Sequence, residues 1–262
     1  MRAPSARTPG VKIALRGVVA TRVELAKSSA DDAPSLRAMT FGAIGGGSSV
    51  RLLSKAQRQQ VAAIATRVRL RPRAIIYRED TTAGWIYTIA SGVVKSYRDL
   101  PSGKRRIAVF LFPEDIFGLA ENGNYVNTAQ AVTEVRLYRI PIDALKALFL
   151  HDGDLQLQFL CKVTHALRQA QRQKIVVTRR DAAGRVAMFF SMLERRSTDA
   201  GDTSTITVPM SRSDIANYLG LSLEAVSRAT TLLTRRRTLE FVDRHTVRIL
   251  DRCRFDRLVA DV

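Results

Sequence analysis

Three side chains in the C-terminal part of the chain have the types and spacing needed to read a DNA base sequence. Ser227 and Arg228 follow Glu224 at three and four residues, so on a helix all three share one face. An arginine can donate two hydrogen bonds to guanine, a carboxylate can accept one from the cytosine amine, and a serine hydroxyl is adaptable. Taken alone, these residues would be better explained as a solvent-exposed Glu–Arg pair, so the flanking sequence must decide.

The flanking residues predict two short helices joined by a sharp turn. Ser211 is a candidate N-cap, and Asp214 completes a Ser-x-x-Asp capping box. Gly220 stands where a left-handed residue ends a helix, and Ser222 caps the helix that carries Glu224. The inward faces are expected to be Ile215, Ala216 and Leu219 on the first helix and Val226, Leu232 and Leu233 on the second. The candidate DNA contacts are Ser211, Arg212, Ser222, Glu224, Ser227 and Arg228.

The elements on either side predict a winged helix-turn-helix domain over residues 179–262. A helix is expected over 181–195 and a strand over 205–208. Two strands, 239–242 and 246–249, would form the wing, and a last helix is expected near 254–259. In this class of domain the second helix of the turn enters the major groove. The base-reading interpretation is therefore favoured over a surface ion pair.

Short strands dominate residues 41–150, after a helix that is predicted over 55–66 with Ser54 as its N-cap. Between Arg67 and Ile140, short alternating or apolar runs are separated by Gly, Pro, Asn and Asp residues. This spacing is typical of a small antiparallel barrel or jelly roll. The runs are 74–77, 85–89, 93–97, 107–111 and 134–138.

A long helix over residues 151–178 carries a narrow apolar stripe. Its positions recur at alternating spacings of three and four residues, which is the pattern of a two-stranded coiled coil. We expect the stripe to form a homodimer interface, because the rest of the helix is polar; packing within its own domain is the alternative. The stripe consists of Leu160, Val163, Leu167, Ala170, Lys174 and Val177, and Lys174 should weaken its C-terminal end.

Composition limits the class of protein. The net charge of +18 favours a polyanionic partner, but the basic excess is not concentrated in residues 179–262. No apolar run approaches the roughly 18 residues of a membrane span, and the first residues lack a signal peptide's apolar core. A cytoplasmic protein without a membrane partner is therefore expected. Residues 1–40 are expected to be a disordered tail; alternatively, Met39 is the true initiator.

The stretch Met210–Leu233 closely resembles the helix-turn-helix of the CRP/FNR superfamily, and the resemblance continues across residues 41–262. Its Glu-x-x-Ser-Arg arrangement is similar to the FNR/FixK branch. The cAMP-receptor branch has Arg where Leu223 stands and Gly where Ser227 stands. The resemblance implies an α+β fold with an N-terminal cyclic-nucleotide-binding-like β-barrel (a jelly roll), a long dimerisation helix and a C-terminal winged helix-turn-helix.

The same resemblance implies a transcription regulator, expected to be an activator, whose partners are double-stranded DNA and RNA polymerase. The DNA site would be an inverted repeat of TTGAT-like half-sites. The resemblance places Arg228 on the guanine, Glu224 on the opposing cytosine side and Ser227 near thymine.

The sensor region departs from the effector sites of the relatives. cAMP-binding relatives carry a Gly-Glu-x-Gly turn and then an Arg-Ser pair on the phosphate, whereas this chain has Phe117 in place of the carboxylate and Asn127 in place of the arginine. An iron–sulfur cluster of the FNR kind needs four thiolates, and the chain has only Cys161 and Cys253. We therefore expect a FixK-like regulator without a cofactor or a metal ion.

Three other interpretations remain open. The first is a ligand-gated regulator that binds haem, nitric oxide or a small anion in the barrel, with His151 and His165 as candidate haem ligands. The second is redox control through Cys253, because Arg252 and Arg254 favour a reactive thiolate. The third is an enzyme, which we do not expect, because the sequence shows no nucleophile–base pair, metal cluster or phosphate loop.

Overall fold

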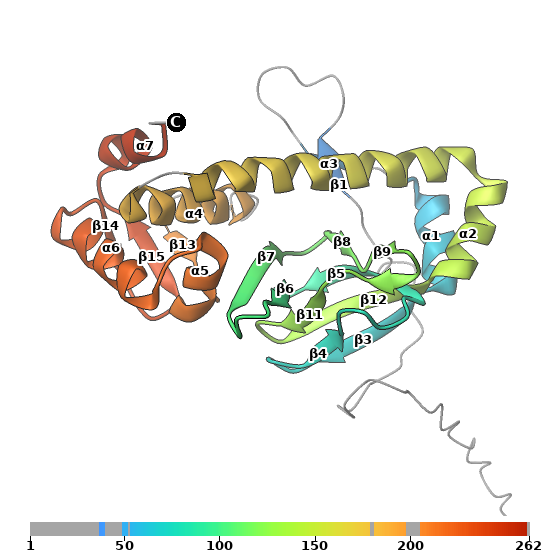
Figure 1. Ribbon diagram of the computed structural model, residues 1–262. Helices are drawn as coiled ribbons and strands as arrows, with labels where there is room; N and C mark the ends of the chain where they lie inside the picture. The colour runs from blue at the N-terminus through green and yellow to red at the C-terminus, as the bar shows by residue number, and fades with distance from the viewer. Residues whose placement is uncertain (1–36, 40–48, 52, 179–180, 198–204, 261–262) are drawn as a thin grey trace, which may run out of the picture.

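The structure is a computed structural model that describes residues 37–39, 49–51, 53–178, 181–197 and 205–260. A β-barrel and a small helical domain lie on the same side of one long helix (Figure 1). Residues 1–36, most of the predicted tail, lie outside the described residues. Where that segment ends, Arg37–Met39 form strand β1, which pairs antiparallel with β2 (Ser49–Arg51), so these residues differ from the predicted tail.

Two four-stranded antiparallel sheets form the barrel, in the orders β4-β11-β6-β7 and β3-β12-β5-β8. Side chains from both sheets, such as Leu137 of one and Val94 of the other, meet in a buried core, as the alternating pattern predicts. The strands are β3 (Thr66–Leu70), β4 (Ile75–Tyr77), β5 (Trp85–Ser91), β6 (Val94–Asp99), β7 (Arg105–Leu111), β8 (Ile116–Phe117), β11 (Thr128–Ala131) and β12 (Val135–Pro141), with a small hairpin of β9 (Ala120–Glu121) and β10 (Asn124–Tyr125).

Three helices cover the outer face of the β3-β12-β5-β8 sheet at one end. Helix α1 (Lys55–Ile64) begins at Ser54, as predicted: Ser54 accepts the N–H of Gln57, and the Gln57 side chain accepts the N–H of Ser54. Helix α2 (Ile142–His151) and the first turns of α3 (Gly153–Thr178) pack against it. With 26 residues, α3 is about 39 Å long, enough to reach from α1 and α2 to the other end of the molecule (Figure 1).

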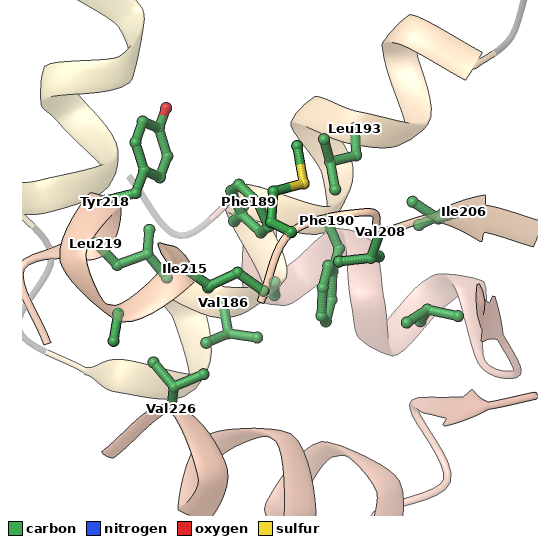
Figure 2. Close-up of a cluster of buried hydrophobic side chains, with 14 of the residues drawn as sticks. Val186, Phe189, Phe190, Leu193, Ile206, Val208, Ile215, Tyr218, Leu219 and Val226 are labelled. Carbon is green, nitrogen blue, oxygen red and sulfur yellow. The ribbon is translucent and has the colours of Figure 1, made fainter. Parts of the chain in front are cut away.

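The C-terminal part is a winged helix-turn-helix, in agreement with the predicted order of elements. Side chains from α4, β13, α5 and α6 converge on one apolar core that contains Phe189 and Phe190 (Figure 2). The elements are α4 (Ala182–Ser197), β13 (Thr205–Thr207), α5 (Arg212–Leu219), α6 (Leu223–Arg235), β14 (Leu239–Phe241), β15 (Thr246–Ile249) and α7 (Arg252–Ala260), and the sheet order is β13-β15-β14.

One predicted core residue of α6 is wrong. Leu232 is 39% exposed, whereas Val226, Ala229 and Leu233 are buried. These three residues are separated by three and four positions, so they lie on one side of the helix, and Leu232 stands about a quarter turn away from Leu233. Ala229, which was not expected on the inward face, is buried there instead of Leu232.

The core of the winged helix-turn-helix continues into the barrel. Ile107 and Phe110 of β7, together with Tyr97 of β6, are buried in the same cluster as Val186 and Phe189 of α4. The barrel and the helix-turn-helix therefore share one hydrophobic core, which fixes their relative orientation in this structure.

Candidate nucleic-acid interface

Hydrogen bonds at the helix ends fix the turn between α5 and α6. The Ser211 hydroxyl accepts the N–H of Asp214 at 3.0 Å, and the Ser222 hydroxyl accepts the N–H of Ala225 at 3.1 Å. Gly220 ends α5 in the left-handed region, at φ 64° and ψ 35°. Both predicted caps and the glycine turn are confirmed.

The second half of the predicted capping box is replaced by a longer-range contact. The carboxylate of Asp214 does not close the box; its Oδ1 lies 2.6 Å from Nζ of Lys95 on strand β6. A lysine ammonium offers a charged donor, which a carboxylate binds more strongly than a neutral N–H.

The outward face of α6 presents the three residues predicted to read bases. Glu224 and Arg228 are exposed and Ser227 is half-buried, while the opposite face of the helix is buried. The pKa of Glu224 lies below its ordinary value, because its own backbone N–H and the Ser222 hydroxyl donate to the carboxylate and Arg228 is close by. Glu224 is therefore an ionised hydrogen-bond acceptor beside the arginine donor.

The remaining candidate contacts surround this face. Ser211, Arg212 and Ser222 are all exposed. The guanidinium carbon of Arg212 lies 5.8 Å from the centre of the Phe241 ring, so this side chain lies between the start of α5 and strand β14. Arg244, which was not among the predicted contacts, is a further exposed basic residue in the turn between β14 and β15. A basic residue between the two predicted wing strands was the signal that could have identified it.

Helix α3 presents exposed leucines where the sequence predicts a dimer interface. Leu160 and Leu167 are 60% and 58% exposed, and Val163 is half-buried. Leu157, which the sequence analysis omitted, is 58% exposed. The side chains of Ala170, Lys174 and Val177 lie outside the described residues.

Aromatic rings pack against one another in the barrel around Phe117. Phe117, which the resemblance places where cAMP-binding relatives have a carboxylate, lies 5.2 Å from Tyr87 between ring centres. The rings of Tyr77 and Tyr125 stack at 3.9 Å, and Tyr77 lies 5.5 Å from Tyr87. Burial raises the pKa of Tyr77 and of Tyr87 well above the ordinary value. The rings of Tyr77, Tyr87 and Tyr125 therefore pack together in the interior of the barrel beside Phe117.

Gly118 is essential to this aromatic packing, and its replacement should be costly. It has φ +83°, and a Cβ atom there would lie 2.7 Å from Cδ2 of Tyr87. We expect Gly118→Ala to lower the free energy of unfolding by about 2–4 kcal/mol through left-handed strain and overpacking. Urea denaturation measures the change. Gly84→Ala is the matched control, because a Cβ at Gly84 meets nothing within 4 Å; equal losses in the two variants would contradict the packing described.

Other predicted chemical groups are dispersed. Among the described residues, no three His, Cys, Asp or Glu side chains come close enough together to hold a metal ion. His151 is exposed at the end of α2, and the side chain of His165 lies outside the described residues. In the described part of the chain, no helix is both long and apolar enough to cross a membrane.

The thiol of Cys253 is exposed, but its flanking arginines already bind carboxylates. Arg252 lies 2.5 Å from Glu194, and Arg254 lies 3.6 Å from Asp251. Their charge is therefore shared with acidic partners, which weakens the basis for the redox hypothesis.

Comparisons with known proteins agree with this architecture. A model of the cyclic nucleotide-binding domain matches residues 67–152, and a model of the Crp-like helix-turn-helix domain matches residues 184–258. The chain is 34% identical to the transcriptional activatory protein AadR of Rhodopseudomonas palustris over 216 residues, which cover 79% of this chain and 87% of AadR.

Two FixK proteins are also similar. The nitrogen fixation regulation protein FixK of Azorhizobium caulinodans is 34% identical over 202 residues, covering 76% of this chain and 82% of that protein. The solved structure of FixK2 from Bradyrhizobium japonicum has a TM-score of 0.69 and 31% identity, and covers 76% of this chain and 99% of that one. The chain therefore belongs to the CRP/FNR family of transcription regulators, with a cyclic-nucleotide-binding-type barrel and a DNA-binding helix-turn-helix.

Proposed function

We propose that this regulator binds, as a homodimer, an inverted repeat of TTGAT-like half-sites in double-stranded DNA and activates transcription from it. The exposed face of α6 carries the proposal: Arg228 donates to the guanine, Glu224 accepts from the paired cytosine and Ser227 lies near thymine. The similarity to AadR, a transcriptional activatory protein, supports activation. RNA polymerase would then be a partner, and the cytoplasm the site of action.

Residues around α6 would anchor the domain on the DNA backbone. Ser211 and Ser222, at the starts of α5 and α6, and Arg212 are exposed next to the recognition face. Helix N-termini and arginines are common phosphate contacts, which set the register of a protein on the duplex. We add Arg244 to this group, because it is an exposed arginine in the wing, which directly follows the recognition helix along the chain.

The exposed leucines of α3 define the dimer interface that we propose. Leu157, Leu160, Thr164 and Leu167 repeat at spacings of three, four and three residues on the face opposite the buried Leu155 and Phe159. This places Val163 at the margin of the seam and adds Leu157. Of the other predicted positions, Lys174 falls on the continuation of this seam, whereas Ala170 and Val177 belong with Val163 to the alternative register.

The chain would then divide into a sensor barrel (41–150), a dimerisation helix (151–178) and a DNA-binding domain (179–262). We propose that the barrel takes no cyclic nucleotide, and that the regulator works without a cofactor. The stacked rings of Tyr77, Tyr87, Phe117 and Tyr125 support this, as does the uncharged Asn127 in place of a phosphate-binding arginine.

Addition of cAMP should therefore leave the protein unchanged. A ligand that binds only the folded state raises the free energy of unfolding, by about 2.7 kcal/mol at one hundred times its Kd, and therefore raises Tm. We expect no change in Tm, and none in DNA affinity, at millimolar cAMP in a thermal scan and a titration. A rise in Tm or in DNA affinity would contradict the proposal that the barrel takes no cyclic nucleotide. A Soret band in the purified protein would support the haem-gated alternative.

Selection of bound sequences from random double-stranded DNA tests the proposed function. The full-length protein should enrich an inverted repeat in which a guanine recurs once in each half. Enrichment of direct repeats, of single unpaired half-sites or of no motif would overturn the proposal.

A further inference from the structure

A partly buried ion pair holds the first helix of the helix-turn-helix against the barrel. Nζ of Lys95 on β6 lies 2.6 Å from Oδ1 of Asp214 on α5, and the two side chains are only 12% and 15% exposed. Removing one partner from such a pair leaves the other charge largely shielded from water and uncompensated, which is unfavourable. The pair therefore connects strand β6 of the barrel to helix α5, which directly precedes the recognition helix α6.

Aromatic packing extends this contact across three elements. The buried Phe110 ring on β7 lies 5.2 Å from Tyr218 on α5 and 6.0 Å from Phe189 on α4, and the latter two rings are 5.5 Å apart. Close-packed rings tolerate few relative orientations of the elements that carry them. The contact is therefore specific in geometry as well as in charge.

A second charged group joins the barrel to the long helix and to α4. Asp115, in the turn after β7, lies 2.9 Å from Arg196 on α4 and 3.8 Å from Nζ of Lys162 on α3. Its carboxylate also accepts the N–H of Phe112, whose ring lies 4.6 Å from the Arg196 guanidinium carbon. Asp115 thus contacts both the long helix α3 and the first helix of the DNA-binding domain.

These contacts leave the recognition surface free. They lie on α4 and α5, whereas Glu224 and Arg228 on α6 remain exposed. In a dimer joined along α3, the distance between the two α6 helices depends on how each helix-turn-helix is seated on its own barrel. Half-sites must match that distance, because recognition helices enter successive major grooves on one side of the duplex.

We infer that Lys95 and Asp115 are positioning residues for DNA recognition. Through Asp214 and Arg196 they hold α6 at the separation that an inverted repeat requires, with no effector bound. The inference rests on the proposed function, since it needs a dimer that reads two half-sites. In this inference the barrel contributes to DNA recognition by fixing the position of the helix-turn-helix.

Lys95→Met tests the inference against Lys146→Met, which removes an exposed Lys–Asp pair on α2. Each full-length protein is titrated with a single half-site and with inverted repeats at the preferred spacing and at one base pair more or less. For Lys95→Met we expect an affinity loss on the order of tenfold at the preferred spacing, a flattened spacing preference and an unchanged half-site affinity. Lys146→Met should behave as the wild type.

Asp115→Asn and Asp214→Asn keep the side-chain shape and serve if Lys95→Met fails to fold. Combining Lys95→Met with Asp214→Asn should cost no more than the larger single loss, because the two residues act through one contact. An unchanged spacing preference in all three variants would overturn the inference, as would tighter binding, which would mean that the contact restrains the domain. Absence of specific binding by the wild type would instead overturn the proposed function itself.

Discussion

Replacing Leu160 and Leu167 together with glutamate is expected to convert the dimer into a monomer. Both side chains are more than half exposed in the protomer, so the fold of one chain should survive the change. In a dimer the new carboxylates would face each other across an apolar seam, where like charges are strongly unfavourable. The two linked half-site contacts would then become independent, and affinity for the inverted repeat should fall by about 10²–10⁴-fold.

Sedimentation velocity and a DNA titration measure both effects. Leu150→Glu is the matched control, because Leu150 is 84% exposed but lies on α2, away from the seam. This variant should remain a dimer and bind as the wild type. A dimer that persists at micromolar concentration in the double variant would show that the seam lies elsewhere.

Arg228→Ala is expected to remove discrimination at one base pair. The lost bidentate contact should cost about 1–3 kcal/mol at the guanine of each half-site. The loss should shrink to almost nothing on DNA that already carries another base there, because the contact is absent in that complex. Glu224, which pairs with the opposite strand in this account, should then dominate the remaining preference.

The wild type and Arg228→Ala are each titrated with DNA that carries the guanine and with DNA that carries another base there, and the four affinities measure this coupling. Arg257→Ala is the control, since Arg257 is exposed on α7, away from the recognition face. An equal loss on every sequence would mean that Arg228 contacts phosphate rather than guanine.

Local signals made the helix-turn-helix predictable. Ser211, Gly220 and Ser222 act within a few residues of themselves, through caps and a left-handed turn, so their roles can be identified from spacing alone. The most polar strands of the barrel were harder. Strand β11 (Thr128–Ala131) carries no large apolar residue, so it did not resemble a typical strand. Strand β3 does alternate Val68 and Leu70 with arginines, but it has only two apolar residues and was not among the predicted runs.

Contacts between distant segments could not be predicted. Lys95 and Asp214 are 119 residues apart, and the sequence analysis assigned Asp214 to the cap of its own helix. Leu157 was omitted for a similar reason. Leu160 and Leu167 fit two heptad registers, one with Val163 and one with Leu157 and Thr164. Only the burial of Leu155 and Phe159 on the opposite face shows which register is exposed. Which face of a helix is free depends on what packs against the other face.

The central claim is that the exposed face of α6 reads a specific inverted repeat, rather than that a protein of net charge +18 binds DNA by charge alone. Competition at one fixed salt concentration tests it most directly, with the TTGAT-like inverted repeat against a scrambled duplex of the same length and composition. We predict that the repeat binds about 10³-fold more tightly, or more, as specific sites do. Equal affinity for the two duplexes would contradict the account.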